Sequence, residues 1–264
     1  MINGISIEQN AIATICKIDE FSDELKQEIR ARLSTICHGP DSVNAAAVFA
    51  SYKQTLKEFN KRYNSKQENT KKGMIGELLT HILLLKIHSH LEPASPFFNM
   101  EEGSIKKGFD LVVFDNKLDQ IWISEVKSGN AGVQNSDSFN KSLLNTAKND
   151  LNGRLQENET NLWHNAINGA KIALSKGNIK DQINKILEEC YQEAASKEQN
   201  GSNKNVILIS VTYKDTSDPI SLDVVEDKGK AIIEEELFND VLVFSIQKET
   251  YQRIAAFLEN EAAL

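Results

Sequence analysis

Four residues in this sequence have the types and the order of a metal-dependent hydrolytic site. Glu77 follows a glycine in a predicted helix, Asp110 opens a predicted strand, and Glu125 and Lys127 end the next strand. Clustered carboxylates repel one another and retain protons unless a cation neutralises them. Their oxygens suit Mg²⁺ or Mn²⁺, which polarises a phosphoryl oxygen and lowers the pKa of a bound water. A lysine beside the metal orients or deprotonates that water, or stabilises charge on the phosphate. This combination predicts phosphodiester hydrolysis.

The elements around these residues are expected to bring three of them together. The apolar run after Asp110 and the run that ends at Lys127 are separated by turn-forming residues 115–119, which is the pattern of a β-hairpin. A hairpin places the start of its first strand beside the end of its second, so Asp110 should lie close to Glu125 and Lys127. Because side chains alternate along a strand, Glu125 and Lys127 should share one face and Val126 should lie on the other.

The Glu-x-Lys pattern has a simpler interpretation when it is taken alone. On a strand, such a pair is most often a solvated face with a weak cross-strand interaction. The aspartate at the head of the partner strand, the glycine before it and the upstream Gly-Glu favour the catalytic interpretation. We therefore predict that Asp110, Glu125 and the backbone carbonyl of Val126 bind Mg²⁺, with Mn²⁺ as a substitute. Glu77 is predicted to bind the metal directly or through water.

The same residues resemble the PD-(D/E)xK nuclease superfamily, the fold of many restriction enzymes and recombination nucleases. In that superfamily a helix Glu, a strand Asp and a Glu-x-Lys form the metal site, and Glu77, Asp110, Glu125 and Lys127 take those places. The proline that usually precedes the Asp is Phe109 here, a departure that does not touch the chemistry. The resemblance implies a restriction-endonuclease-like core with these four residues as the catalytic set.

A narrower resemblance would extend over most of the chain. Segments 76–79, 107–110 and 122–127 are similar to the HamA family, the nuclease subunits of the Hachiman anti-phage defence system. This resemblance implies a Mg²⁺-dependent deoxyribonuclease and a HamB-like helicase partner that restrains it until aberrant DNA is met. Two other interpretations remain open. One is a stand-alone restriction-type or structure-specific endonuclease. The other is a non-catalytic nucleic-acid-binding subunit, against which the intact set of acids and lysine argues.

The net charge of the chain is −8, which argues against a free-standing DNA-binding protein. Phosphate contacts dominate affinity for nucleic acids, so such proteins usually carry a basic surface. Either a local basic rim binds the DNA, or a partner protein delivers it. Lys66 and Lys71 lie close to the motif acids in the sequence and could belong to this rim. The lysines predicted to contact nucleic acid are Lys72, Lys106, Lys107 and Lys141.

Length and composition indicate a globular cytoplasmic protein. The 264 residues suffice for one large domain, or for a core with a helical appendage. No apolar run reaches the length of a membrane span, and the N-terminus lacks a signal-peptide pattern. Cys16, Cys37 and Cys190 are far apart and lack Cys-x-x-Cys spacing. This favours buried reduced thiols over a disulfide framework or a zinc site.

Hydrophobic periodicity predicts a mixed α/β fold. Besides the hairpin, continuous apolar runs predict buried strands at 206–212 and 241–246. The predicted architecture is a mixed β-sheet flanked by helices, with a mainly helical region at 1–70 and a nuclease domain at 71–264. This domain carries a helical insert at about 136–198. The predicted helices cover 22–33, 42–63, 72–90, 136–158, 160–198, 228–237 and 249–260.

Overall fold

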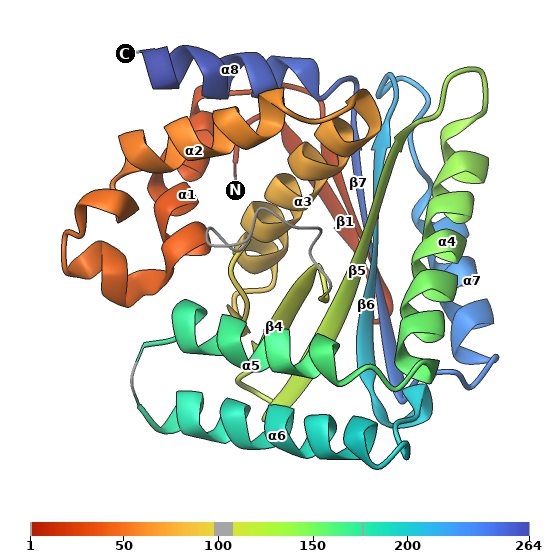
Figure 1. The fold of residues 1–264 in the computed structure, drawn as a ribbon. Helices are drawn as coiled ribbons and strands as arrows, with labels where there is room; N and C mark the ends of the chain where they lie inside the picture. The colour runs from red at the N-terminus through yellow and green to blue at the C-terminus, as the bar shows by residue number, and fades with distance from the viewer. Residues whose placement is uncertain (1, 98–107, 176, 264) are drawn as a thin grey trace.

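The chain folds around one mixed β-sheet (Figure 1). The computed structural model describes residues 2–97, 108–175 and 177–263. In order across the sheet, the strands in these residues are β1 (Ile5–Gln9), β2 (Ala13–Ile18), β7 (Asp240–Lys248), β6 (Asn205–Tyr213), β5 (Gln120–Asn130), β4 (Leu111–Asp115) and β3 (Leu91–Pro93). The four central strands β2, β7, β6 and β5 are parallel, whereas β1, β4 and β3 each pair antiparallel to their neighbours.

Helices cover both faces of this sheet (Figure 1). One face carries α1 (Asp23–Asn44), α2 (Tyr52–Asn64), α3 (Glu68–Ile87) and α8 (Gln252–Ala263); the other carries α4 (Ser136–Gln156), α5 (Thr160–Ala173), α6 (Asn178–Ala195) and α7 (Leu222–Ile233). Short 3₁₀ turns form η1 (Val48–Ala50) and η2 (Gly201–Asn203). The predicted mixed sheet flanked by helices is confirmed. We name the two sides the α3 face and the α4 face.

Alternation of side chains along the central strands separates two hydrophobic cores. On β5, Val126 packs into the core of the α3 face and Ile123 into the core of the α4 face. β6 is buried along its whole length, so Ile209 joins the first core and Leu208 the second. The sequence of a strand buried on both faces is a continuous apolar run, which is why β6 can be predicted from sequence.

The N-terminal region contains strands that the sequence analysis does not predict. β1 and β2 form an antiparallel pair, and β2 lies beside β7. The region 1–70, predicted as mainly helical, therefore begins with two strands of the same sheet. These strands have five and six residues, and β3 has three. Such short segments give little periodicity to distinguish strand from loop.

The helix boundaries follow local capping and turns. The Oγ atom of Ser22 accepts a hydrogen bond from the backbone N–H of Leu25 at 3.3 Å, which caps α1. Gly39 interrupts α1 with φ of 76°. The helix predicted from residue 42 begins only at Tyr52, because the chain turns after α1 with Ala46 at φ of 51°. By contrast, α7 begins at Leu222, earlier than the start at residue 228 that the sequence predicts.

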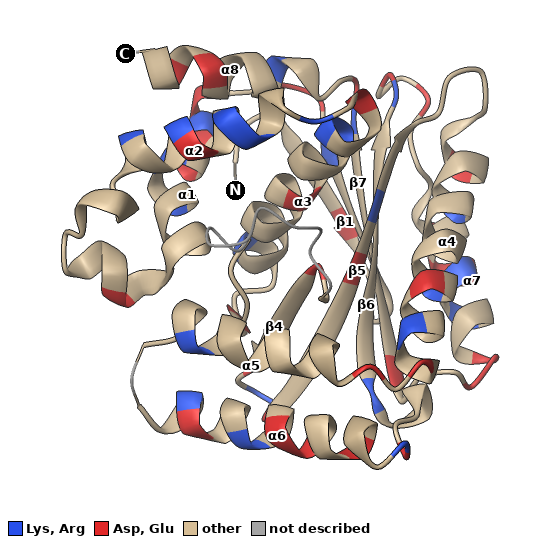
Figure 2. Ribbon diagram, viewed as in Figure 1, with Lys and Arg blue, Asp and Glu red and all other residues tan. Residues whose placement is uncertain are grey.

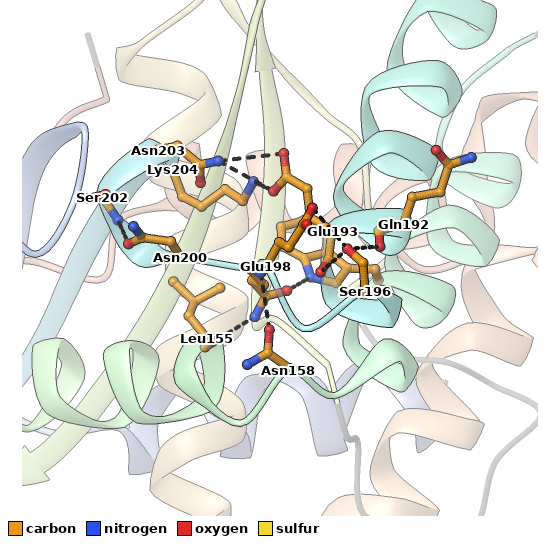
Figure 3. A network of polar contacts seen from close by, with 12 residues as sticks. Leu155, Asn158, Gln192, Glu193, Ser196, Glu198, Asn200, Ser202, Asn203 and Lys204 are labelled. Carbon is orange, nitrogen blue, oxygen red and sulfur yellow. Dashed lines mark hydrogen bonds and ion pairs between the residues drawn. The ribbon is translucent and has the colours of Figure 1, made fainter.

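A polar network fixes the connection between α6 and β6 (Figure 3). The backbone N–H of Gln199 donates to Oδ1 of Asn158 at 3.1 Å, and the side-chain amide of Gln199 donates to the carbonyl of Leu155. Lys204, just before β6, pairs with Glu193 of α6. Because Leu155 and Asn158 lie at the C-terminal end of α4, the network also holds that end of α4 in place.

All three cysteines are buried, as predicted, and their thiols are free. Burial raises the pKa of Cys16 to about 12, so this thiol stays protonated at neutral pH. In the described part of the chain, no helix combines the length and the apolarity required to cross a membrane.

Candidate active site

The candidate site lies where β4 and β5 separate. β4 begins at Leu111, opposite Ser124 of β5, whereas β5 continues to Asn130. The last part of β5 therefore extends beyond its pairing with β4. We name residues 125–130 the β5 extension. Its backbone remains paired with β6 on the other side.

Asp110 lies at the start of the β5 extension. Its backbone N–H donates to the carbonyl of Ser124 at 3.3 Å, and its Oδ2 atom accepts a hydrogen bond from the backbone N–H of Val126 at 2.7 Å. The carboxylate thus replaces a strand as the partner of Val126. Because the N–H and C=O of one strand residue point to the same side, the Val126 carbonyl also faces the side of Asp110. The predicted closeness of Asp110 to the Glu-x-Lys strand is confirmed.

Glu125 and Lys127 both lie on the α4 face, as the alternation of side chains predicts. Glu125 is only 3% exposed, and its Oε1 atom is 2.8 Å from Nζ of Lys127. Val126, between them, packs in the core of the α3 face. A carboxylate buried this deeply requires charged or hydrogen-bonding partners, and Lys127 is one of them.

Helix α4 adds two charged residues that the sequence analysis does not identify. Oδ2 of Asp150 is 2.7 Å from Nζ of Lys127. Arg154 pairs with Oε2 of Glu125, and its Nη1 donates to the carbonyl of Gly108 at 2.9 Å. Asp150 and Arg154 are four residues apart, so they share one side of the helix. The sequence signal is weak, because charged residues beside an apolar helical stripe are common on solvated helices.

The charges of this group are nearly balanced. Three carboxylates, from Asp110, Glu125 and Asp150, lie around two cations, Lys127 and Arg154. Burial lowers the pKa of Arg154, and the charge of Asp110 raises it. A guanidinium remains charged at neutral pH even so. Both oxygens of Glu125 therefore face cations in this arrangement.

Glu77 comes from the α3 face. Helix α3 packs closely on β5 at Gly76, where a Cβ atom would lie 2.9 Å from Cβ of Ser128. Glu77 follows directly and is half-buried. The structure thus gathers Asp110, Glu125 and Lys127 on one side of β5, whereas Glu77 starts from the other side. Because no β4 strand lies beside the β5 extension, side chains from the α3 face and the α4 face can approach each other there.

The predicted nucleic-acid contacts are dispersed. Lys72 is half-buried; its Nζ donates to Oδ1 of Asn69 at 3.2 Å and its carbonyl accepts from the hydroxyl of Tyr213 at 3.0 Å. Lys141 is exposed on α4, where its charge adds to the effect of burial in lowering the pKa of Lys228 on α7. Lys141 therefore lies toward α7. Two of the predicted contacts fall outside the described residues, Lys106 and Lys107.

The donor atoms at the site suit a hard divalent cation. The carboxylates of Asp110 and Glu125 and the carbonyl of Val126 are oxygen ligands of the kind that Mg²⁺ prefers. Among the residues that the structure describes, no three His, Cys, Asp or Glu side chains are gathered closely enough to form a metal cluster as they stand. Binding of a metal would therefore require Glu125 to exchange a protein cation for it. The ligand set stays a prediction.

Comparison with known proteins supports a family for this chain. The family model HamA matches residues 6–262, which is nearly the whole chain and includes every residue of the candidate site. A comparison with curated proteins gives no match.

Proposed function

Because the chain belongs to the HamA family and is thus related to Hachiman antiviral defence, we propose that it is a metal-dependent nuclease that hydrolyses phosphodiester bonds of DNA. The observation that carries the proposal is the meeting of Asp110, Glu125 and Lys127 at the β5 extension. Two acids where β4 and β5 separate, with a lysine beside them, support a site of the PD-(D/E)xK type. The HamA match supports a defence function but not, by itself, this chemistry.

Each residue has its own task in the proposed reaction. When bound, Mg²⁺ supplies Lewis-acid activation of the phosphate and of a water molecule. Asp110, Glu125 and the Val126 carbonyl would hold the cation, and Glu77 would contribute from the α3 face directly or through water. The ammonium of Lys127 lies 2.8 Å from Glu125 and 2.7 Å from a carboxylate of α4. We assign it the stabilisation of charge on the phosphate and the orientation of the attacking water.

The first test compares DNA cleavage by variants of two lysines. Lys127→Met removes the ammonium but keeps an unbranched apolar side chain, so the fold should persist. Loss of one electrostatic or acid–base group typically lowers the rate by about 10²–10⁴-fold, and we expect a loss of this size. Lys171→Met, at an exposed position of α5, is the matched control and should cleave at the wild-type rate.

The second test measures Mg²⁺ binding by calorimetry. Asp110→Asn keeps an oxygen that can accept from Val126 but removes the charge, so Mg²⁺ affinity should fall sharply. Asp119→Asn, in the exposed turn of the same hairpin, should bind Mg²⁺ as the wild type does. Equal affinity in wild type and Asp110→Asn, or near-full cleavage by Lys127→Met, would reject this site.

We also propose that a helicase partner restrains the nuclease. Membership of the HamA family supports a multi-protein defence system, and the net charge of −8 favours delivery of DNA by a partner. We expect co-purification with a helicase encoded beside this chain, and cleavage that depends on DNA and ATP in the complex. Failure to bind any such helicase, together with sequence-specific cutting by the isolated chain, would favour the stand-alone endonuclease instead.

A further inference from the structure

Helix α2 carries an exposed row of lysines on an otherwise acidic protein. Lys53, Lys57 and Lys61 repeat every four residues and are all exposed. At a rise of 1.5 Å per residue, the row spans about 12 Å along the helix. Figure 2 shows basic positions, in blue, along α2. The chain as a whole has a net charge of −8, so this local excess of positive charge requires an explanation.

The core of the α3 face determines which way the row points. Leu56 and Phe59 are fully buried under α2, and Tyr63 is 5% exposed. These residues take up the inner side of the helix, which leaves the lysines on the outer side. Their orientation is thus set by packing and does not depend on the lysines themselves.

The three lysines are not committed to ion pairs. On the same helix, Arg62 pairs with Glu58 at 3.1 Å. Within the described residues, no carboxylate lies within 4.0 Å of the ammonium groups of Lys53, Lys57 or Lys61. Each of these charges is therefore available to an external anion.

The row leads toward the candidate site. After α2 the chain continues through Lys66 to Lys71, whose ammonium lies 5.2 Å from the ring centre of Tyr63. One turn later Gly76 packs against Ser128, within the β5 extension. The basic segment therefore ends where the two sides of the site can meet. Acids are present near this end too, since Glu68 and Glu259 add to the effect of burial in raising the pKa of Tyr63.

We propose that the lysine row of α2 binds the phosphate backbone of double-stranded DNA and guides it to the β5 extension. This inference rests on the proposed nuclease function. Ammonium groups at regular spacing on a rigid helix contact phosphates without reading sequence. Loss of such contacts should weaken binding to all duplexes alike and reduce the dependence of binding on salt.

The experiment uses the full chain with Asp110→Asn, so that the DNA stays intact. Binding of a labelled DNA duplex is measured by fluorescence anisotropy between 50 and 200 mM salt, as is binding of an RNA duplex of the same sequence. The test variant carries Lys53→Gln, Lys57→Gln and Lys61→Gln. The matched control carries three exposed lysines elsewhere changed in the same way, Lys117→Gln, Lys171→Gln and Lys185→Gln. Both triple variants lower the net charge by the same amount.

We expect the α2 variant to bind DNA at least tenfold more weakly at the lowest salt. Its slope of log K against log salt should be smaller by about 2 to 3, because each phosphate contact contributes about 0.9. The control should match the parent. Equal losses in both triple variants would show a non-specific charge effect and overturn the proposal, as would unchanged binding in the α2 variant. If the α2 variant lost more affinity for the RNA duplex than for the DNA duplex, the substrate would be RNA instead of DNA.

A cleavage assay separates this inference from the proposed function. With Asp110 intact, the α2 triple variant should regain wild-type cleavage when DNA is saturating, because the lysines bind substrate and lie outside the reacting group. If no form of the chain cleaves DNA, the nuclease proposal fails, and the anisotropy result still decides whether α2 binds the backbone.

Discussion

The pairing of Arg154 with Glu125 leads to a prediction about stability. Arg154→Met removes a cation from a carboxylate that is 3% exposed, and it also removes the 2.9 Å hydrogen bond to the carbonyl of Gly108. A hydrogen bond to a charged group contributes about 1.5–3 kcal/mol. The Arg154 side chain is 27% exposed, and Lys127 remains on the other oxygen of Glu125, so the lower part of that range applies. We expect the variant to lose about 2 kcal/mol of unfolding free energy.

Urea unfolding followed by circular dichroism at pH 7, in the presence of a chelator, measures this loss. Lys141→Met changes a charged residue on the opposite side of the same helix and should stay within about 0.5 kcal/mol of wild type, as surface substitutions do. In the proposed metal site Mg²⁺ would compete with Arg154 for Glu125, so Arg154→Met should also bind Mg²⁺ about tenfold more tightly in calorimetry. Equal unfolding free energies of Arg154→Met and wild type would refute the reasoning, because Glu125 would then not depend on the guanidinium.

Two further predictions concern residues away from the site. Burial and the neighbouring His90 lower the pKa of His88 to about 4, so the unfolded chain takes up its proton first, near the ordinary pKa of 6.5. The free energy of unfolding should therefore fall by about 2–3 kcal/mol as the pH drops from 6.5 to 4. In urea denaturation over this pH range, the free energy of unfolding of His88→Gln should depend less on pH. An unchanged dependence would contradict the lowered pKa of His88 as the cause. Gly39→Ala should lose about 3 kcal/mol or more, because φ is 76° and the new Cβ would lie 1.7 Å from the carbonyl oxygen of Ile172. Gly73→Ala lies in open space within α3, so its free energy of unfolding should instead rise by a few tenths to about 1 kcal/mol. Similar changes in unfolding free energy for the two variants would exclude steric strain at Gly39.

The parts of the site that sequence predicts are those that local structure connects. Asp110 and the Glu-x-Lys pair belong to one hairpin, so the turn between two apolar runs is sufficient to predict that they meet. The strands β6 and β7 are predictable for a similar reason, since their apolar runs are long and continuous. By contrast, β1 and β2 are short and partly polar, and their place in the sheet depends on pairing with β7 at the far end of the chain. No local pattern contains that information.

The α4 residues illustrate the same limit at the level of single side chains. Glu125 lies in an apolar strand, so sequence alone indicates that its charge needs a partner. Helix α4 carries both acidic and basic residues, and which of them faces β5 is a matter of helix rotation. Lys141 and Asp150 are nine residues apart, about two and a half turns, and therefore lie on opposite sides. Asp150 and Arg154 lie on the side of α4 that faces Lys127 and Glu125 of β5.

The position of the β5 extension explains why one site would draw residues from two faces of a sheet. A strand paired on both edges separates its faces completely, and groups on opposite sides cannot act on one ligand. β4 begins only at Leu111, so within the described residues β5 has no strand beside it on that edge from Glu125 onward and the separation of the two faces ends there; Asp110 supplies the hydrogen bond that a strand would otherwise provide to Val126. The close approach of Gly76 to Ser128 brings the first turns of α3 to the same edge. The glycine before Glu77 is thus explained by packing, since a larger residue would push the helix and its glutamate away from the strand.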